Sequence, residues 1–477
     1  MKQTAYKWID DNQKHLTDMS DKIWNYAELG LWETRSSKLI ADELEKHAFK
    51  LKRGIAGMPT AFVAEWGKTG PTIGIQGEYD ALPGISQKLK TEKDPLTPGH
   101  AGHGCGHNIH GVSGMAGAIA LRYALEADKA KVKFFGTPAE ENYAGKVFMV
   151  KEGHYDDVDA CLSHHPSSIN TARLSSSTAV NGVKFHYHGK TSHAAANPEQ
   201  GRSALDAIEL MNIGVNYLRE HIIQEARIHY VIEAGGGQPN VVPDYARSWY
   251  YIRAPERDQL DPIYKRILKI AEGAAMMTET TLKVEFIDGL YNIIPNKVVA
   301  ETVVKNMREV GAPTYTKKEL EFAAEIAKSF PKEQKIDVLR KVKIPNWEKY
   351  VDVDLPTDIL DPMGDGEAMA GSSDVGDVSW KCPTVEFGTT VNVLGAPGHS
   401  WQFVAMSGGT VAHKSLAFAA KTIAGTAIDL ITQLELLKKA KEEHADRLKG
   451  RTYKTPIPDD CVPPLEIAKV AAVKAQE

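Results

Sequence analysis

The sequence predicts an α/β protein with a central sheet and a separate α+β unit. Through the first 180 residues, short apolar segments bounded by Gly and Pro alternate with longer amphipathic segments, the pattern of strands and covering helices. After Val180 the predicted strands are longer and alternate apolar with polar residues, which is typical of an antiparallel sheet with one exposed face. With 477 residues, 42% of them hydrophobic, the chain is long enough for two or three structural units.

The predicted elements follow from these patterns in chain order. Residues 6–50 alternate charged and apolar positions at helical spacing and predict two or more surface helices. Strands are then expected at 60–66, 72–76, 131–136 and 160–163, with a buried helix at 112–123. The α+β unit has predicted strands at 182–188, 228–234 and 247–254 and helices at 203–221 and 259–277. Helices at 296–310 and 317–330, a polar loop at 344–365, a strand at 384–387 and one long helix at 412–441 complete the chain.

Charge and polarity limit the partners and the compartment. A formal net charge of −5 gives no basic surface suited to a phosphate backbone, so we expect a small-molecule ligand and no nucleic acid. The first twelve residues are polar and no later apolar segment approaches the length of a membrane span, which predicts a cytoplasmic protein that does not bind membranes. The four cysteines are widely separated, so no disulfide framework is expected.

Residues with metal-binding side chains are concentrated between positions 103 and 110, His-Gly-Cys-Gly-His-Asn-Ile-His. Thiolate and neutral imidazole are suitable ligands for zinc, manganese or related divalent ions, and the glycines allow Cys105 and His107 to point to one place. The same residues are compatible with a flexible loop that contains an inert cysteine. The rest of the chain favours the metal site.

Acidic and imidazole side chains also follow three of the predicted strands. They are Glu78 and Asp80, Glu140 and Glu141, and His164 and His165. Taken singly, each pair is compatible with a solvated turn or a helix N-terminus. Because open α/β sheets bind ligands beyond the carboxyl ends of their strands, the repetition favours a functional site. Of the two adjacent glutamates, one could ligate a metal while the other acts as general base.

The α+β unit has three polar residues of interest, His193, Asn240 and Arg253. Considered alone, His193 fits a surface loop and Asn240 fits a turn. The planar guanidinium of Arg253 suits bidentate pairing with a substrate carboxylate, and a structural salt bridge is equally compatible.

Taken in order, these motifs resemble the dinuclear-metal amidohydrolase/carboxypeptidase family, which includes aminoacylases and the hippurate and indole-acetyl-amino-acid hydrolases. The resemblance rests on Glu78 to Pro83, Cys105 to Asn108, Glu140-Glu141, His165-Pro166, Gly189 to Ala195, Asn240 to Pro243, and His399. Within this family, the resemblance is greatest to members that cleave p-aminobenzoyl-glutamate, because they share the segment Ser373 to Trp380 and the long stretch 311–371. That resemblance extends nearly end to end.

The resemblance implies a metallopeptidase-like catalytic domain with a central mixed sheet, formed by residues 1–181 and 296–477. Residues 182–295 would be an inserted α+β lid and dimerisation domain. It also implies two divalent ions per subunit, Mn²⁺ or Zn²⁺, with the ligands Cys105, His107, Glu141, His165 and His399. Glu140 would be the catalytic base and Asp80 would orient a ligand. His193 would reach the active site of a dimer partner and, with Asn240, hold the substrate.

The implied reaction is hydrolysis of the amide bond of an N-acyl amino acid by metal-activated water. The acyl group is expected to be aromatic, as in p-aminobenzoyl-glutamate. A dipeptidase or carboxypeptidase with the same metal site is the alternative. A more distant alternative is a partner subunit that binds metal but does not catalyse a reaction. We expect a homodimer, or a heterodimer with a paralogous subunit.

Overall fold

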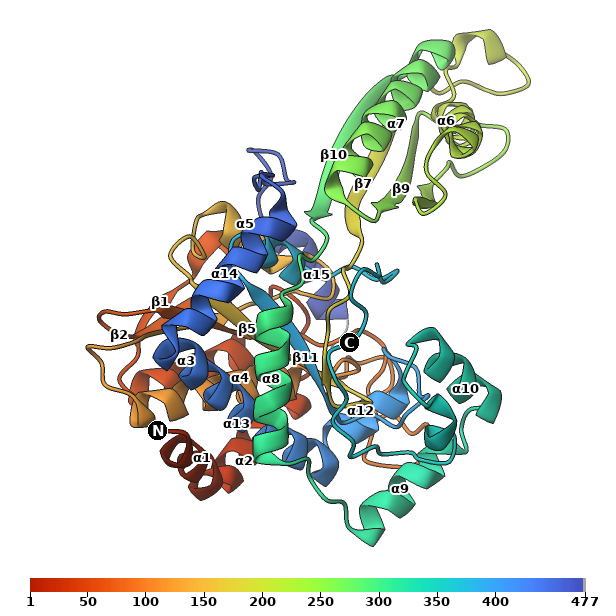
Figure 1. Ribbon diagram of the computed structural model, residues 1–477. Coiled ribbons are helices and arrows are strands. Elements are labelled where there is room, and N and C mark those ends of the chain that lie inside the picture. The colour runs from red at the N-terminus through yellow and green to blue at the C-terminus, as the bar shows by residue number, and fades with distance from the viewer. Residues whose placement is uncertain (475–477) are drawn as a thin grey trace.

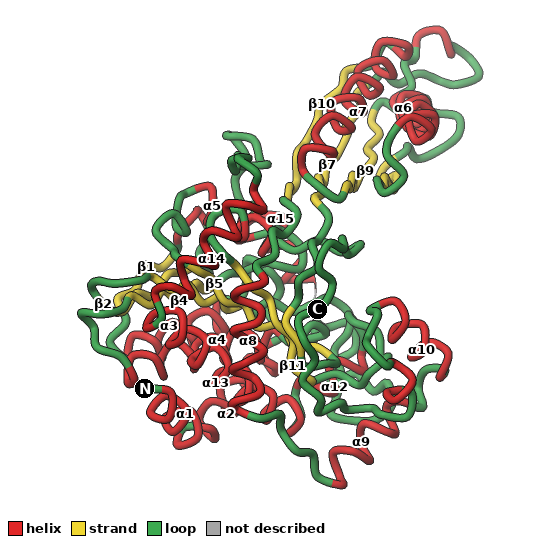
Figure 2. Tube along the Cα trace, in the orientation of Figure 1, coloured by secondary structure: helices red, strands yellow, loops and turns green. Residues whose placement is uncertain are grey.

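The computed structural model describes residues 1–474 and divides its strands between two sheets (Figures 1 and 2). The larger sheet has seven strands. In spatial order they are β1 (Lys50–Arg53), β2 (Phe62–Gly67), β4 (Lys131–Gly136), β3 (Thr72–Gly77), β5 (Ala160–Ser167), β11 (Thr384–Thr390) and β6 (Thr171–Ala172). The central strands β4, β3, β5 and β11 are parallel, whereas β1, β2 and β6 pair antiparallel. The predicted α/β class with a mixed sheet is confirmed.

Both faces of this sheet are covered, which explains why its central strands are buried over most of their length. One face packs on helices α4 and α13, and the other on α5 and α11, with adjacent strand residues such as Phe134 and Phe135 facing opposite cores. At Gly117 a Cβ would come within 2.7 Å of Ile423, so the glycine permits the close approach of α4 and α13. The helices of this domain are α1 (Lys2–Asp11), α2 (Gln13–Tyr26), α3 (Thr34–Lys46), α4 (His107–Ala124), α5 (Gly145–Lys151), α8 (Lys297–Val310), α11 (Val375–Ser379), α12 (Trp401–Ser407), α13 (Thr410–Thr432), α14 (Leu434–Leu448) and α15 (Leu465–Lys474).

The smaller sheet stands away from the larger one and has its own core (Figure 1). Its order is β10 (Thr281–Leu290), β7 (Ala179–His188), β9 (Tyr245–Ala254) and β8 (Arg227–Ala234), all antiparallel. Helices α6 (Ala204–Leu218) and α7 (Arg257–Thr278) pack on one face of it. Residues alternate between buried and half-buried along β9, as expected when only one face of a sheet is covered.

The stretch 311–371 forms a separate layer beside α12 (Figure 1). It contains α9 (Lys317–Ala327) and α10 (Lys332–Lys341), followed by irregular chain with one turn of 3-10 helix, η4 (Trp347–Tyr350), all within the described part of the molecule. Gln334 of α10 donates a side-chain hydrogen bond to the carbonyl of Gly395, and Gln402 donates one to Ser329 Oγ. The stretch therefore supports the loop that carries His399. The other 3-10 turns are η1 (Ile55–Gly57), η2 (Pro198–Gln200) and η3 (Arg219–His221).

The predicted elements differ most from the structure at three places, and one predicted absence is wrong. The helix expected from Val112 begins at His107, the strand expected to end at Ser163 continues to Ser167, and the single helix predicted for 412–441 is two helices that meet at Gln433. In addition, α13 is long and apolar enough to cross a membrane, contrary to the expectation that no segment would be. However, 89% of its most apolar window is buried inside the protein, and such burial is characteristic of a core helix.

Candidate metal centre

Five predicted ligands converge at the carboxyl ends of the parallel strands. Cys105 and His107 lie where α4 begins, Glu141 follows β4, His165 lies in β5, and His399 precedes α12. Ligand atoms of Cys105, His107 and His165 lie within 4.8 Å of one another, as do those of Cys105, Glu141 and His399. The two groups share Cys105. The arrangement therefore offers two adjoining ion positions with one thiol between them.

The individual distances support this grouping. Cys105 Sγ lies 3.3 Å from His165 Nε2, and His399 Nε2 lies 3.3 Å from Glu141 Oε2. His107 Nε2 and Glu141 Oε1 are 4.0 Å apart. All of these are atoms with lone pairs, which suit a cation between them better than direct contact with one another.

The backbone at the site adopts conformations that bring these side chains together. Gly106 has φ +77°, and a Cβ there would also lie 2.9 Å from Pro166, so this position between two predicted ligands requires glycine. His399 has φ +51°, which is unusual for a residue with a side chain. Such strain is often found at functional sites, where the surrounding structure enforces it.

Asp80 orients two of the candidate ligands. Its Oδ1 lies 2.9 Å from His107 Nδ1, and its Oδ2 accepts a hydrogen bond from the Glu141 backbone N–H at 3.0 Å. His107 can therefore donate its Nδ1 proton to Asp80 and present the Nε2 lone pair to the site. His165 has the same arrangement, with Nδ1 2.9 Å from the carbonyl oxygen of Pro166 and Nε2 facing Cys105.

Glu140 lies beside the cluster as a half-buried acid–base candidate. Its carboxylate, Glu78 and His107 also have ligand atoms within 4.8 Å of one another. Burial and the negative charges of Glu78 and Glu141 raise the pKa of Glu140 well above its ordinary value. Charges as close as these also favour a bound cation, which acts on the pKa in the opposite direction.

The other histidines near the cluster have structural partners. His164 Nδ1 contacts Ser113 Oγ at 2.9 Å and its Nε2 contacts Thr389 Oγ1 at 2.6 Å, so of the two adjacent histidines only His165 joins the cluster. His103 Nε2 hydrogen-bonds the carbonyl of Ile23 at 3.0 Å. His110 Nδ1 accepts the backbone N–H of Glu78.

Three predicted site residues lie outside the cluster. His193 and Asn240 occupy neighbouring loops of the smaller sheet, and both are exposed. They lie beyond the end of the sheet where His188 pairs with Tyr245, whereas the end at Val180 joins the catalytic domain. The ten residues of β7 span about 33 Å at roughly 3.3 Å each, so these two residues do not reach the cluster of their own chain.

Arg253 lies at the opposite end of that sheet, paired with Val180. Its Nη1 donates a hydrogen bond of 2.8 Å to Ser372 Oγ, and its guanidinium lies over the ring of Tyr251. Arg253 therefore links the smaller sheet to the chain around Ser372, at the junction between the two domains.

Two residues of the site were not identified from the sequence, Lys146 and Asp374. Lys146 Nζ lies 2.6 Å from Glu78 Oε1 and 2.6 Å from Asp374 Oδ1, and all three side chains are buried. Asp374 belongs to the Ser-Asp-Val-Gly segment that contributed to the resemblance, which was a usable signal. Lys146 is the second residue of α5 and lies in an apolar segment, where no local pattern marks it as a site residue.

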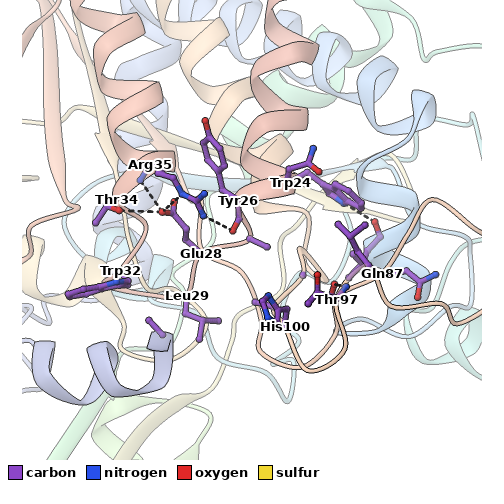
Figure 3. Close-up of a pocket in the computed structure, with 18 residues that line it drawn as sticks. Trp24, Tyr26, Glu28, Leu29, Trp32, Thr34, Arg35, Gln87, Thr97 and His100 are labelled. Atoms are coloured by element: carbon purple, nitrogen blue, oxygen red, sulfur yellow. Dashed lines mark hydrogen bonds and ion pairs between the residues drawn. The ribbon is translucent and has the colours of Figure 1, made fainter. Parts of the chain in front are cut away.

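A cavity of about 460 Å³ is lined in part by residues 100–102 of the loop that precedes Cys105 (Figure 3). Trp24, Tyr26 and Trp32 contribute aromatic surface, and Glu28 is already paired with Arg35 and with the start of α3. Among the described residues that line it, none belongs to the metal-type cluster. This cavity is therefore separate from the candidate centre.

Comparisons with known proteins agree with the geometry. Residues 74–345 match the model of peptidase family M20/M25/M40. The chain is 37% identical over 480 residues to a p-aminobenzoyl-glutamate hydrolase subunit of Escherichia coli (strain K12), an alignment that covers 97% of this chain and 99% of the relative. It is 30% identical to an Xaa-Arg dipeptidase of Mus musculus, covering 94% and 93%. A dinuclear metal binding peptidase of Bacillus subtilis has a similar fold, with TM-score 0.56 and 17% identity, covering 89% of this chain and 99% of that one.

Proposed function

Because the chain belongs to peptidase family M20/M25/M40 and hydrolyses amide bonds, we propose that its substrate is an N-acyl amino acid with an aromatic acyl group. Glutamate is the leading candidate for the amino-acid part. The observation that carries this proposal is the end-to-end similarity to a p-aminobenzoyl-glutamate hydrolase subunit, which includes the long stretch 311–371 that supports the His399 loop. A dipeptidase is the second candidate, because the Xaa-Arg dipeptidase is also similar over nearly the whole chain.

We propose that two divalent ions bind at Cys105, His107, Glu141, His165 and His399. The residues fit such ions, because His107 Nε2 and Glu141 Oε1 are buried and have no hydrogen-bond partner within residues 1–474. A thiolate among imidazoles and a carboxylate suits either zinc or manganese. When bound, the ions supply Lewis acidity that activates water and polarises the amide carbonyl.

The side chains have separate tasks in this proposal. Glu140 accepts the proton of the attacking water and transfers it to the nitrogen of the leaving amine. Asp80 fixes the His107 ring and the backbone of Glu141 through its two oxygens. His193 and Asn240, both supplied by a dimer partner, donate hydrogen bonds to the substrate. His193 Nδ1 accepts the backbone N–H groups of Ala195 and Ala196, which leaves the Nε2 proton available for donation.

The smaller domain suits a role in dimerisation, and we assign residues 182–295 to it and 1–181 and 296–477 to the catalytic domain. Its edge strand β8 exposes Val231 and Ile232, and its helices expose Tyr217, Met276 and Met277. An edge strand with exposed apolar residues is a ready site for pairing with another chain. A homodimer is the simplest form, and a heterodimer with a paralogous subunit is the alternative. None of the four cysteines forms a disulfide within the described residues, which agrees with a cytoplasmic location.

The substrate proposal is tested with a panel of amides and controlled metal content. We expect the chelator-stripped chain to be inactive and to recover with Mn²⁺ or Zn²⁺. We also expect kcat/KM for p-aminobenzoyl-glutamate to exceed that for hippurate, an indole-acetyl conjugate and a dipeptide ending in arginine by about tenfold or more. Release of the free amino acid measures each rate. A preference for the dipeptide would replace the first candidate function with the second.

The proposed role of His193 across a dimer predicts complementation between two inactive variants. His193→Ala and Glu140→Gln should each be nearly inactive, whereas their coexpression should restore about a quarter of wild-type activity, because half of the randomly formed dimers contain one intact site. Coexpression of Glu140→Gln with itself is the control. No recovery in a purified heterodimer would show that His193 does not serve the partner's site.

A further inference from the structure

The carboxylate of Glu78 is held in the candidate centre by a buried ionic pair. Its Oε1 lies 2.6 Å from Lys146 Nζ, and Lys146 Nζ is also 2.6 Å from Asp374 Oδ1. The backbone N–H of Lys146 donates a further hydrogen bond of 2.9 Å to Asp374 Oδ2. With Lys146 fixed on two carboxylates, the orientation of the Glu78 side chain is fixed as well.

The second oxygen of Glu78 has no such partner. Glu78 Oε2 lies 3.1 Å from His107 Nε2, but both atoms are buried and neither has an aligned hydrogen-bond partner anywhere in residues 1–474. His110 Nε2 is 3.5 Å away and lies closer to Ser163 Oγ, at 3.2 Å. A buried carboxylate oxygen without a donor is costly, so native structures normally satisfy it with a donor or a cation.

His107 does not supply that donor. Its Nδ1 faces Asp80, so in the neutral ring the Nε2 atom is a lone pair directed at the same space as Glu78 Oε2. A carboxylate oxygen of Glu140 lies within 4.8 Å of one ligand atom of Glu78 and one of His107. Three acceptors therefore converge where a cation would satisfy them.

Building on the proposed metal centre, we propose that Glu78 is a further ligand of the ion bound by His107 and His165. Lys146 and Asp374 act as positioning residues: Lys146 binds the Oε1 atom and leaves Oε2 for the ion. With Glu78 as the carboxylate ligand of this ion, Glu140 is not needed as a ligand and remains available as the base. The assignment also explains the buried lysine, since its charge offsets that of the added carboxylate.

The test is metal titration of stripped protein, read by competition with a chromophoric chelator and by elemental analysis. Glu78→Gln keeps the side-chain volume and an oxygen that can accept from Lys146, but removes the charge. The variant should retain one ion with wild-type affinity and bind the second about 100-fold more weakly. Removing a residue that only hydrogen-bonds to a metal ligand already lowers metal affinity by about 10- to 100-fold. Asp429→Asn is the matched control, because it removes another buried carboxylate paired with a lysine, Lys2, and should leave both affinities unchanged.

The outcomes separate this inference from the proposed function. Wild-type affinity for both ions in Glu78→Gln would overturn the Glu78 assignment while leaving the five-ligand site intact. A wild-type chain that binds no ion would refute the proposed function itself. If circular dichroism shows that Glu78→Gln does not fold, Glu78→Asp decides by the same titration: it keeps the charge but withdraws the oxygens by one methylene, and the same selective loss is expected.

Discussion

Glu140→Gln should reduce kcat by about 10²- to 10⁴-fold while the protein retains its bound metal. The substituted amide has the same size as the carboxylate but cannot accept the proton of the attacking water. Glu140 is not among the five proposed ligands, so metal content should be unchanged. The measurement is the rate of glutamate release from p-aminobenzoyl-glutamate, together with elemental analysis of the same preparation.

The control for this prediction is Glu65→Gln, at a half-buried position in β2 outside the cluster, which should keep wild-type turnover. The structure also defines the informative failure. Because a Glu140 oxygen lies within 4.8 Å of ligand atoms of Glu78 and His107, joint loss of turnover and one metal ion would mean that Glu140 is a ligand. Unchanged turnover would show that another residue is the base.

Most of the predicted site residues that converged were marked by local sequence. Cys105 and His107 flank a glycine, and Glu140 and Glu141 directly follow a strand, so spacing and the carboxyl-end rule are sufficient to bring them together. His399 follows no predicted strand in the same way, and only the resemblance to a family indicated it. His193 was assigned to a partner's site by resemblance, and its distance from the cluster of its own chain follows from the length of β7.

The wrong boundaries have physical causes that no short window of sequence contains. The strand predicted to end at Ser163 continues through His164 and His165 because it pairs with β11, and because Ser113 and Thr389 satisfy the buried His164 ring. Hydrophobic periodicity continues past Gln433, so the break between α13 and α14 was not visible in the pattern. In both cases tertiary contacts decide the element.

Lys146 is the clearest residue that local reasoning could not find. A lysine in a short helix is usually exposed, and its burial here depends on Asp374, 228 positions away in the chain. Although burial lowers the pKa of Lys146, Asp374 and Glu78 raise it above its ordinary value, so the side chain remains charged. The long-range pairing thus makes an otherwise unfavourable buried charge stable.

Lys146→Met should therefore lower the free energy of unfolding of the catalytic domain by about 3 to 5 kcal/mol, because it leaves two buried carboxylates without their counter-ion. Urea denaturation followed by tryptophan fluorescence measures this loss. The signal reports mainly on the catalytic domain, because Trp249 is the one tryptophan within residues 182–295 and all the others lie outside that range. The experiment is made on metal-free protein, so that a lost ion does not contribute to the difference.

The double variant Lys146→Met/Asp374→Asn separates loss of the ion pair from loss of packing. The amide that replaces the Asp374 carboxylate is neutral, so one uncompensated charge is removed and the double variant should recover part of the lost stability relative to Lys146→Met. Lys7→Met is the control, because Lys7 pairs with Asp11 on an exposed helix surface and its removal should change stability little. If Lys146→Met is as stable as this control, the buried lysine is not required to compensate Glu78 and Asp374. Equal stability of the single and double variants would instead attribute the loss to packing around the lysine stem.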